Sequence, residues 1–165
     1  VQVFFRLRML SVKTAREVQC SMRKAGGERK MNGQENLRIV QEGYAAFARG
    51  DVAAALSIYS DDIDWAMPGS PDIFAYAGQR RGREQVAQFY STFAQTEEVE
   101  QMELQDFIAQ GEKVLVFGHY KGRVKSTGRS YTKDFVHVVT LRDGKVMKFR
   151  EYSASDDMYA AFAGR

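Results

Sequence analysis

The segment TGRSYTKDFVHVVTLRDGKVMKFREY, residues 127–152, decides the fold class because apolar and polar residues alternate on both sides of a turn signal. Alternation with a period of two is typical of strands that bury one face, and it predicts strands over Tyr131–Leu141 and Val146–Ser153. Asp143-Gly144, which lies between them, is a residue pair that two-residue hairpin turns prefer. The segment therefore predicts an antiparallel hairpin.

The residues before this hairpin extend it into a larger α+β fold. Met102 and Leu104 mark one further strand, and Val114–Arg123 marks another, so the second half of the chain reads as an antiparallel meander. The first half instead shows apolar residues at three- and four-residue steps, which predicts helices. The predicted elements of the first half are helices over Leu37–Phe47, Asp51–Tyr59 and Arg83–Gln95, a strand over Ile63–Met67 and a loop over 68–80. Helices followed by a meander are typical of the α+β class, and Asp156 is placed to begin a short terminal helix.

Composition excludes several classes of protein. The chain has 165 residues, of which 44% are hydrophobic and 27% charged, as in globular domains. Its apolar runs are shorter than the roughly 18 residues that a membrane span needs. Cys20 is the single cysteine and His119 and His137 are the two histidines, so a disulfide framework or a zinc site rich in these ligands is excluded. We expect a cytoplasmic protein. We also expect no metal and no cofactor, because no phosphate-binding glycine loop follows a strand and no His/carboxylate ligand spacing appears.

The basic character of the chain is confined to its beginning. Residues 1–31 hold eight basic and two acidic groups, a net charge of +6, whereas residues 32–165 hold sixteen basic and nineteen acidic groups, a net charge of −3. No nucleic-acid partner is expected, because no basic stripe crosses the second part. Two readings of residues 1–31 stay open, an amphipathic transit peptide and residues upstream of a natural start at Met31. We favour the second, and we expect a single domain over 32–165 with the basic extension outside its fold.

Three stretches resemble a known family. They are GYAAFARGDVAAALSIYSDDIDWAMPG at 43–69, YAGQRRGREQVAQFY at 76–90 and the segment 127–152 quoted above. Together they look like the SnoaL-like polyketide cyclase group of the nuclear transport factor 2-like superfamily, whose relatives include ketosteroid isomerases and limonene epoxide hydrolases. The resemblance implies a cone, made by a curved, mainly antiparallel sheet wrapped over three N-terminal helices, with an apolar pocket inside. It also implies a homodimer.

The turns predict which side chains share a face of the sheet. A two-residue turn at Asp143-Gly144 pairs Glu151 with Val136, and an equally tight turn at Thr127-Gly128 pairs His119 with Val136. One face then carries Phe117, His119, Lys121, Asp134, Val136, Val138, Phe149 and Glu151. The opposite face carries Tyr120, Phe135, His137, Val139, Lys148, Arg150 and Tyr152.

The resemblance to the epoxide hydrolases assigns the first face to the pocket, because their base is the acidic residue after an arginine, which is Glu151 here. An acidic partner lies in that family at or next to the position of His119. Burial among apolar residues is expected to raise the pKa of the Glu151 carboxyl. The predicted catalytic groups are therefore Glu151 and His119, with Asp134 as a further candidate whose alternative is an ion pair with Lys121.

The expected pocket wall is apolar and aromatic. Its predicted members are Trp65, Met67, Phe74, Tyr76, Tyr90 and Phe117. Met67 stands where ketosteroid isomerases place their base and epoxide hydrolases a water-positioning amide, and a thioether does neither task. The known chemistry of either relative is therefore not expected in full.

Two functions from different classes follow. The first is a cofactor-free acid–base enzyme, of the isomerase, cyclase or hydrolase type, that acts on a small apolar molecule. The second is a binding or dimeric scaffold protein with the same cone and no turnover. The loss of a base at Met67 favours the second, and the retained Glu151 favours the first. The expected homodimer would form through the outer sheet face, where Phe135, Val139 and Tyr152 need cover.

Overall fold

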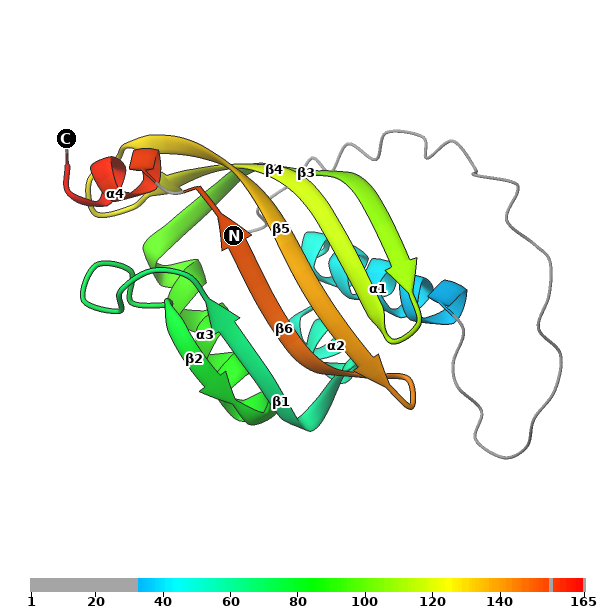
Figure 1. Ribbon diagram of the computed structural model, residues 1–165. Coiled ribbons are helices and arrows are strands. Elements are labelled where there is room, and N and C mark those ends of the chain that lie inside the picture. The colour runs from blue at the N-terminus through cyan, green and yellow to red at the C-terminus, as the bar shows by residue number, and fades with distance from the viewer. Residues whose placement is uncertain (1–32, 155, 165) are drawn as a thin grey trace, which may run out of the picture.

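The computed structural model describes residues 33–154 and 156–164, which form four helices and one six-stranded sheet (Figure 1). In chain order the elements are α1 (Gly33–Ala48), α2 (Val52–Ser57), β1 (Tyr59–Met67), β2 (Gly78–Arg81), α3 (Gly82–Thr96), β3 (Glu97–Gln110), β4 (Lys113–Val124), β5 (Ser130–Arg142), β6 (Lys145–Ser153) and α4 (Asp156–Phe162). The predicted α+β class is confirmed. The basic extension predicted at 1–31 lies outside the described residues.

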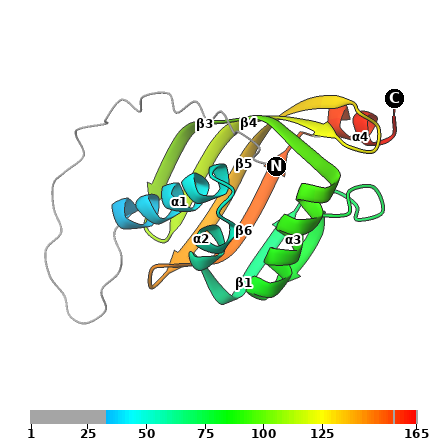
Figure 2. The same ribbon diagram turned by 180° about the vertical axis from the view of Figure 1, so that it is seen from behind.

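The sheet is mixed and curved, and its strand order is β2-β1-β6-β5-β4-β3. β1 pairs with β6 in parallel, and the other neighbouring strands pair antiparallel. Figure 2 shows α1, α2 and α3 together on one face of this sheet. None of the helices in the described ranges is long and apolar enough to cross a membrane.

Helix α1 lies close to the sheet because its inner side combines apolar residues with one glycine. Val40 is 2% exposed, and Tyr44 and Phe47 pack against the core one and two turns later. A side chain at Gly43 would collide with Ile58, the residue that caps α2, so the glycine allows the close approach of α1 to the end of α2. Tyr44, the next residue of α1, contacts His137 on β5.

The first half of the chain holds one more strand than predicted. Gly78–Arg81 forms β2 and pairs antiparallel with β1, although its first three residues fall in the loop predicted over 68–80. The second helix ends at Ser57 instead of Tyr59, and β1 begins at Tyr59 instead of Ile63. Four residues with alternating exposure carry too weak a periodic signal to be recognised as a strand.

The hairpin turn was predicted correctly, but the pairing beyond it was not. Asp143 and Gly144 both have positive φ, 51° and 75°, as a type I′ turn requires, and Arg142 pairs with Lys145. A β-bulge then inserts Met147, because Leu141 pairs with Val146 whereas Thr140 pairs with Lys148. One extra residue turns every later side chain of β6 to the other face.

The prediction of which residues share a face is therefore wrong for β6. Glu151 pairs with His137, not with Val136. His119 pairs with Asp134, because the turn between β4 and β5 is longer than two residues. That second change is a shift by two, which leaves His119 and Asp134 on the face predicted for them. The bulge in β6 is what places Glu151 on the opposite face.

Candidate functional site

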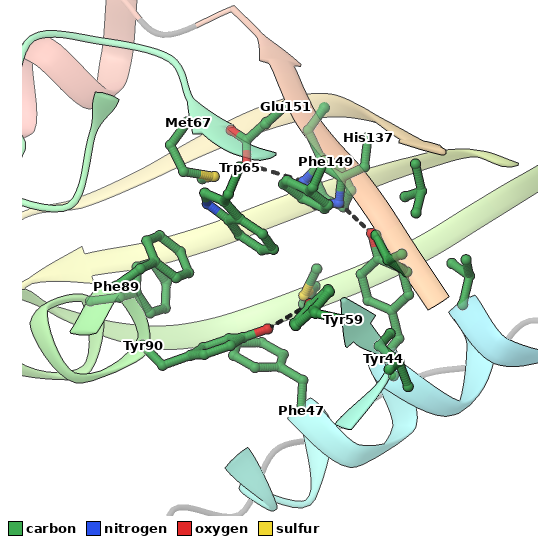
Figure 3. Close-up of a pocket in the computed structure, with 18 of the residues that line it drawn as sticks. Tyr44, Phe47, Tyr59, Trp65, Met67, Phe89, Tyr90, His137, Phe149 and Glu151 are labelled. Carbon is green, nitrogen blue, oxygen red and sulfur yellow. Dashed lines mark hydrogen bonds and ion pairs between the residues drawn. The ribbon is translucent and has the colours of Figure 1, made fainter. Parts of the chain in front are cut away.

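A cavity of about 100 Å³ lies between the helices and the concave face of the sheet (Figure 3). Half of the residues around it are aromatic, and Lys133 and Glu151 are the charged ones. The lining residues are Val40, Gly43, Tyr44, Phe47, Ile58, Tyr59, Trp65, Met67, Phe89, Tyr90, Phe93, Met102, Tyr120, Lys133, Phe135, His137, Val139, Val146, Phe149 and Glu151. Such a wall suits an apolar ligand that is held by a few polar contacts.

Three of the polar lining residues form one continuous chain of hydrogen bonds. Tyr44 Oη bonds to Nδ1 of His137, and Nε2 of His137 lies 3.1 Å from Oε2 of Glu151. Figure 3 shows Tyr44 reaching from α1 to the His137 ring on β5. We call Tyr44, His137 and Glu151 the relay.

Two more groups hold the Glu151 end of the relay. Nζ of Lys133 donates to Oε1 of Glu151 at 2.5 Å, and Oγ of Ser153 donates to the same oxygen at 3.0 Å. The side chains of Lys133 and Glu151 are 6% and 4% exposed, so this is a buried ion pair. Both carboxylate oxygens have partners, as a buried charge requires.

The charge on Glu151 is fixed by these partners. Burial by itself raises the pKa of this carboxyl, but the Lys133 ammonium and the His137 ring outweigh burial and lower the pKa to about 2. The prediction of a raised pKa is therefore wrong, because it considered burial among apolar residues and did not include the buried Lys133. Glu151 is a carboxylate at neutral pH.

The ionised Glu151 also determines how the His137 ring is protonated. Burial lowers the pKa of His137, so the ring is neutral near pH 7 and carries one proton. A carboxylate can only accept, so this proton sits on Nε2 and Nδ1 accepts the hydroxyl proton of Tyr44. Burial raises the pKa of Tyr44, so its hydroxyl is protonated at rest.

The order of groups in the relay resembles a nucleophile–histidine–carboxylate triad. A histidine that is oriented by a carboxylate accepts a proton more readily, because the carboxylate stabilises the imidazolium. All three relay residues line the cavity, and Tyr44 is the end of the relay that carries a hydroxyl group. The arrangement can take a proton from a ligand at Tyr44 Oη while the tyrosine's own proton moves to His137.

The low pKa of Glu151 predicts acid-sensitive stability. The folded-state value of about 2 lies below the ordinary 4.5, so the carboxylate stabilises the fold above about pH 4.5, and this contribution is lost as the pH falls toward 2. The loss amounts to about 3 kcal/mol. Urea unfolding at several pH values measures it.

The control for this prediction is Glu151→Gln, which has no carboxyl to titrate. Its free energy of unfolding should fall less between neutral pH and pH 3 than that of the wild type. Some acid loss remains in both proteins, because the pKa of Glu100 is also lowered to about 2 by its bonds to Arg123 and Lys121. If the free energy of unfolding fell equally with pH in the wild type and in Glu151→Gln, the low pKa assigned to Glu151 would be contradicted.

A second buried carboxylate lies outside the relay. Glu97, which is 3% exposed, accepts hydrogen bonds from Tyr76, from Tyr120 at 2.8 Å and from Tyr131 at 2.6 Å. Burial and then the Glu97 charge raise the pKa values of the three tyrosines, so all three hydroxyls stay protonated and donate. The cluster joins β3, β4, β5 and the segment before β2.

The structure brings some of the predicted site residues to the cavity. Glu151, Trp65, Met67 and Tyr90 line it. Phe74 instead packs on α4, with its ring centroid 4.7 Å from those of Tyr159 and Phe162.

Four other predicted site residues do not line the cavity. Tyr76 bonds to Glu97. Phe117, His119 and Asp134 lie on the outer face of the sheet, where Nδ1 of His119 is 2.7 Å from Asp134 Oδ1. The predicted His119–Glu151 pair is thus wrong in geometry, because the bulge after the hairpin turns Glu151 inward and leaves His119 outside.

Sequence reasoning missed Lys133, His137 and Tyr44. Lys133 and His137 share one face of β5 with Phe135. The resemblance to the epoxide hydrolases, applied to an unbulged hairpin, assigned this face to the outside. The available signal was the adjacent apolar pair Val146-Met147, which breaks the alternation at the bulge. Within residues 33–154 and 156–164, no group of three or more His, Cys, Asp or Glu side chains is arranged to hold a metal ion.

Comparisons with known proteins agree with this architecture. The SnoaL-like domain family matches residues 40–149. A crystal structure of an NTF2-like protein from Burkholderia xenovorans has 38% sequence identity and a TM-score of 0.73, over 80% of this chain and 98% of that chain. An uncharacterized protein of Mycobacterium tuberculosis is 28% identical over 127 residues, 75% of this chain and 92% of that protein. A crystal structure of TerC co-crystallized with polyporic acid has 26% identity and a TM-score of 0.68, over 78% of this chain and 98% of that chain.

Proposed function

Because the chain belongs to the SnoaL-like domain family, we propose that it is a cofactor-free acid–base enzyme for a small, largely apolar organic molecule. One observation carries this proposal. A histidine fixed by a carboxylate presents a tyrosine hydroxyl to an apolar cavity. The reaction class is isomerisation, cyclisation or hydrolysis, each of which needs a proton moved at a defined point.

The relay accounts for proton transfer without any further group. The ligand's proton goes to Tyr44 Oη, and the proton of Tyr44 goes to Nδ1 of His137, while the electron pair of the broken bond stays on the ligand. Glu151 stabilises the imidazolium that results, and Lys133 keeps Glu151 ionised. The return of both protons, at the same or another atom of the ligand, completes the cycle.

The proposal can be tested without knowing the substrate. The protein is incubated in deuterium oxide with a panel of apolar enolisable ketones, 1,3-dicarbonyl compounds and epoxides. Mass spectrometry then detects deuterium incorporation or addition of water. We expect at least one class to react faster than in buffer, and reaction of none would contradict the proposal.

A binding or scaffold protein is the second candidate, and one observation favours it. Glu151 has a full set of hydrogen-bond partners, as a purely structural ion pair would. Similarity to TerC, which was co-crystallized with polyporic acid, supports small-molecule binding under either function. Tight binding of panel compounds with no turnover would favour this second candidate.

We also propose a homodimer through the outer sheet face, although with other residues than expected. Phe135 and Val139 line the cavity, but Ile108 and Tyr152 on the outer face are 49% and 61% exposed. Figure 1 looks onto this face, and in the described part of the chain α1, α2 and α3 lie behind it. A second copy would cover its apolar side chains.

Sedimentation equilibrium at micromolar concentration tests the dimer. The wild type should sediment with twice the chain mass of 18.7 kDa. Val136→Lys should sediment as a monomer, because it places a charge beside Phe117 in the middle of this face. A wild type that stays monomeric would contradict the proposal.

A further inference from the structure

Trp65 carries a polar atom that the relay does not use. The side chain lines the cavity from β1 and is 3% exposed, and its Nε1 has no hydrogen-bond partner among the described residues. A buried indole N–H normally finds an acceptor, and leaving it without one costs stability. The Nε1–H group is therefore available to donate a hydrogen bond to an acceptor on a ligand, since none of the described residues accepts one from it.

The indole lies on the same wall as the relay. Trp65 pairs with Phe149 across β1 and β6, and the two rings stack with centroids 3.8 Å apart. Phe149 precedes Glu151 by two residues on the same face, and its ring centroid is 4.8 Å from that of His137. Figure 3 shows the indole nitrogen on the edge of the ring that faces away from His137. One ligand can thus meet the relay at one end and this N–H at another.

The acceptor should be neutral. Lys133 and Glu151 are the charged residues among those that line the cavity, and they neutralise each other at 2.5 Å. No cation of the described lining residues is left to balance an anionic ligand, and burial of an unpaired charge is costly. A carbonyl oxygen on a flat apolar body satisfies both the N–H and the surrounding aromatic rings.

We propose that Trp65 Nε1–H binds a neutral carbonyl oxygen of the ligand and so determines specificity for flat apolar carbonyl compounds. This inference rests on the proposed function for its ligand class. A neutral hydrogen bond of this kind favours a ligand that has the oxygen over one that lacks it by about 3- to 10-fold.

The test uses a matched pair of probes, 1-tetralone and tetralin, which share a bicyclic skeleton and differ in one carbonyl group. Trp65 is the single tryptophan of the chain, so the ¹⁵N-labelled protein gives a single indole N–H signal. We expect 1-tetralone to move this proton downfield and tetralin not to do so. Titration should show 1-tetralone to bind about 3- to 10-fold more tightly than tetralin.

Two variants separate the N–H from the shape of the wall. Trp65→Phe keeps an aromatic ring but has no donor, and it should bind the two probes equally. Phe89→Leu changes the wall beside Trp65 but keeps the donor, so the preference should remain. If Trp65→Phe does not fold, the shift of the wild-type indole N–H signal still tests whether the carbonyl oxygen binds Nε1.

Several outcomes would overturn the inference. They are an unmoved indole signal with equal affinities, a preference that persists in Trp65→Phe, and no binding of either probe at millimolar concentration. Failure of the proposed function would look different, because it concerns turnover alone. Loss of deuterium exchange with an intact probe preference would contradict the relay and leave the Trp65 contact standing.

Discussion

Tyr44→Phe should lower turnover by about 10²-fold or more, the usual scale for losing a general acid or base. The variant lacks the hydroxyl that contacts His137 and keeps the ring that packs on the core. Ligand binding should change little, because the cavity wall retains its aromatic surface. Initial rates of deuterium exchange on a reactive panel compound measure the effect.

Tyr152→Phe is the matched control for this change. It removes the same atom from a tyrosine that is 61% exposed on the outer face. Its exchange rate should equal that of the wild type. A Tyr44→Phe enzyme with wild-type turnover would show that the proton passes through another group.

Lys133→Met should destabilise the fold by about 3–5 kcal/mol, because it leaves Glu151 as an uncompensated buried charge. Chemical unfolding near neutral pH measures the loss. The double variant Lys133→Met with Glu151→Gln should recover part of the loss, because it removes the stranded charge as well. This recovery is the result that separates a charge effect from a simple packing defect.

Lys121→Met provides the comparison for an exposed ion pair. The Lys121 side chain is 45% exposed and pairs with Glu100 at 3.1 Å. Surface pairs contribute about 1 kcal/mol or less, so this variant should unfold almost like the wild type. Similar losses for Lys121→Met and Lys133→Met would contradict the special role of the buried pair.

The sequence was sufficient for the parts of the fold that depend on local signals. Asp143-Gly144 adopts the predicted turn, and the helix that carries Val40 and Tyr44 forms where its apolar spacing placed it. Both features arise from residues close to each other along the chain, so alternation and turn chemistry determine them.

The composition of the site depended on a feature that alternation does not encode. The bulge at Met147 reverses the faces of β6, so Glu151 meets His137 and Lys133 instead of His119. The pKa of Glu151 is therefore lowered and not raised as expected, because the ion pair with Lys133 depends on the three-dimensional structure. Tyr44 was missed for a related reason, since its partner lies 93 residues away.

The two histidines of the chain allow a direct test of proton transfer through His137. His137 lies in the relay, whereas His119 lies on the outer face beside Asp134. The rate of deuterium incorporation into a reactive panel compound is compared between His137→Gln and His119→Gln. We expect a loss of about 10²-fold or more for His137→Gln and a wild-type rate for His119→Gln. Equal rates in the two variants would contradict a proton relay through His137.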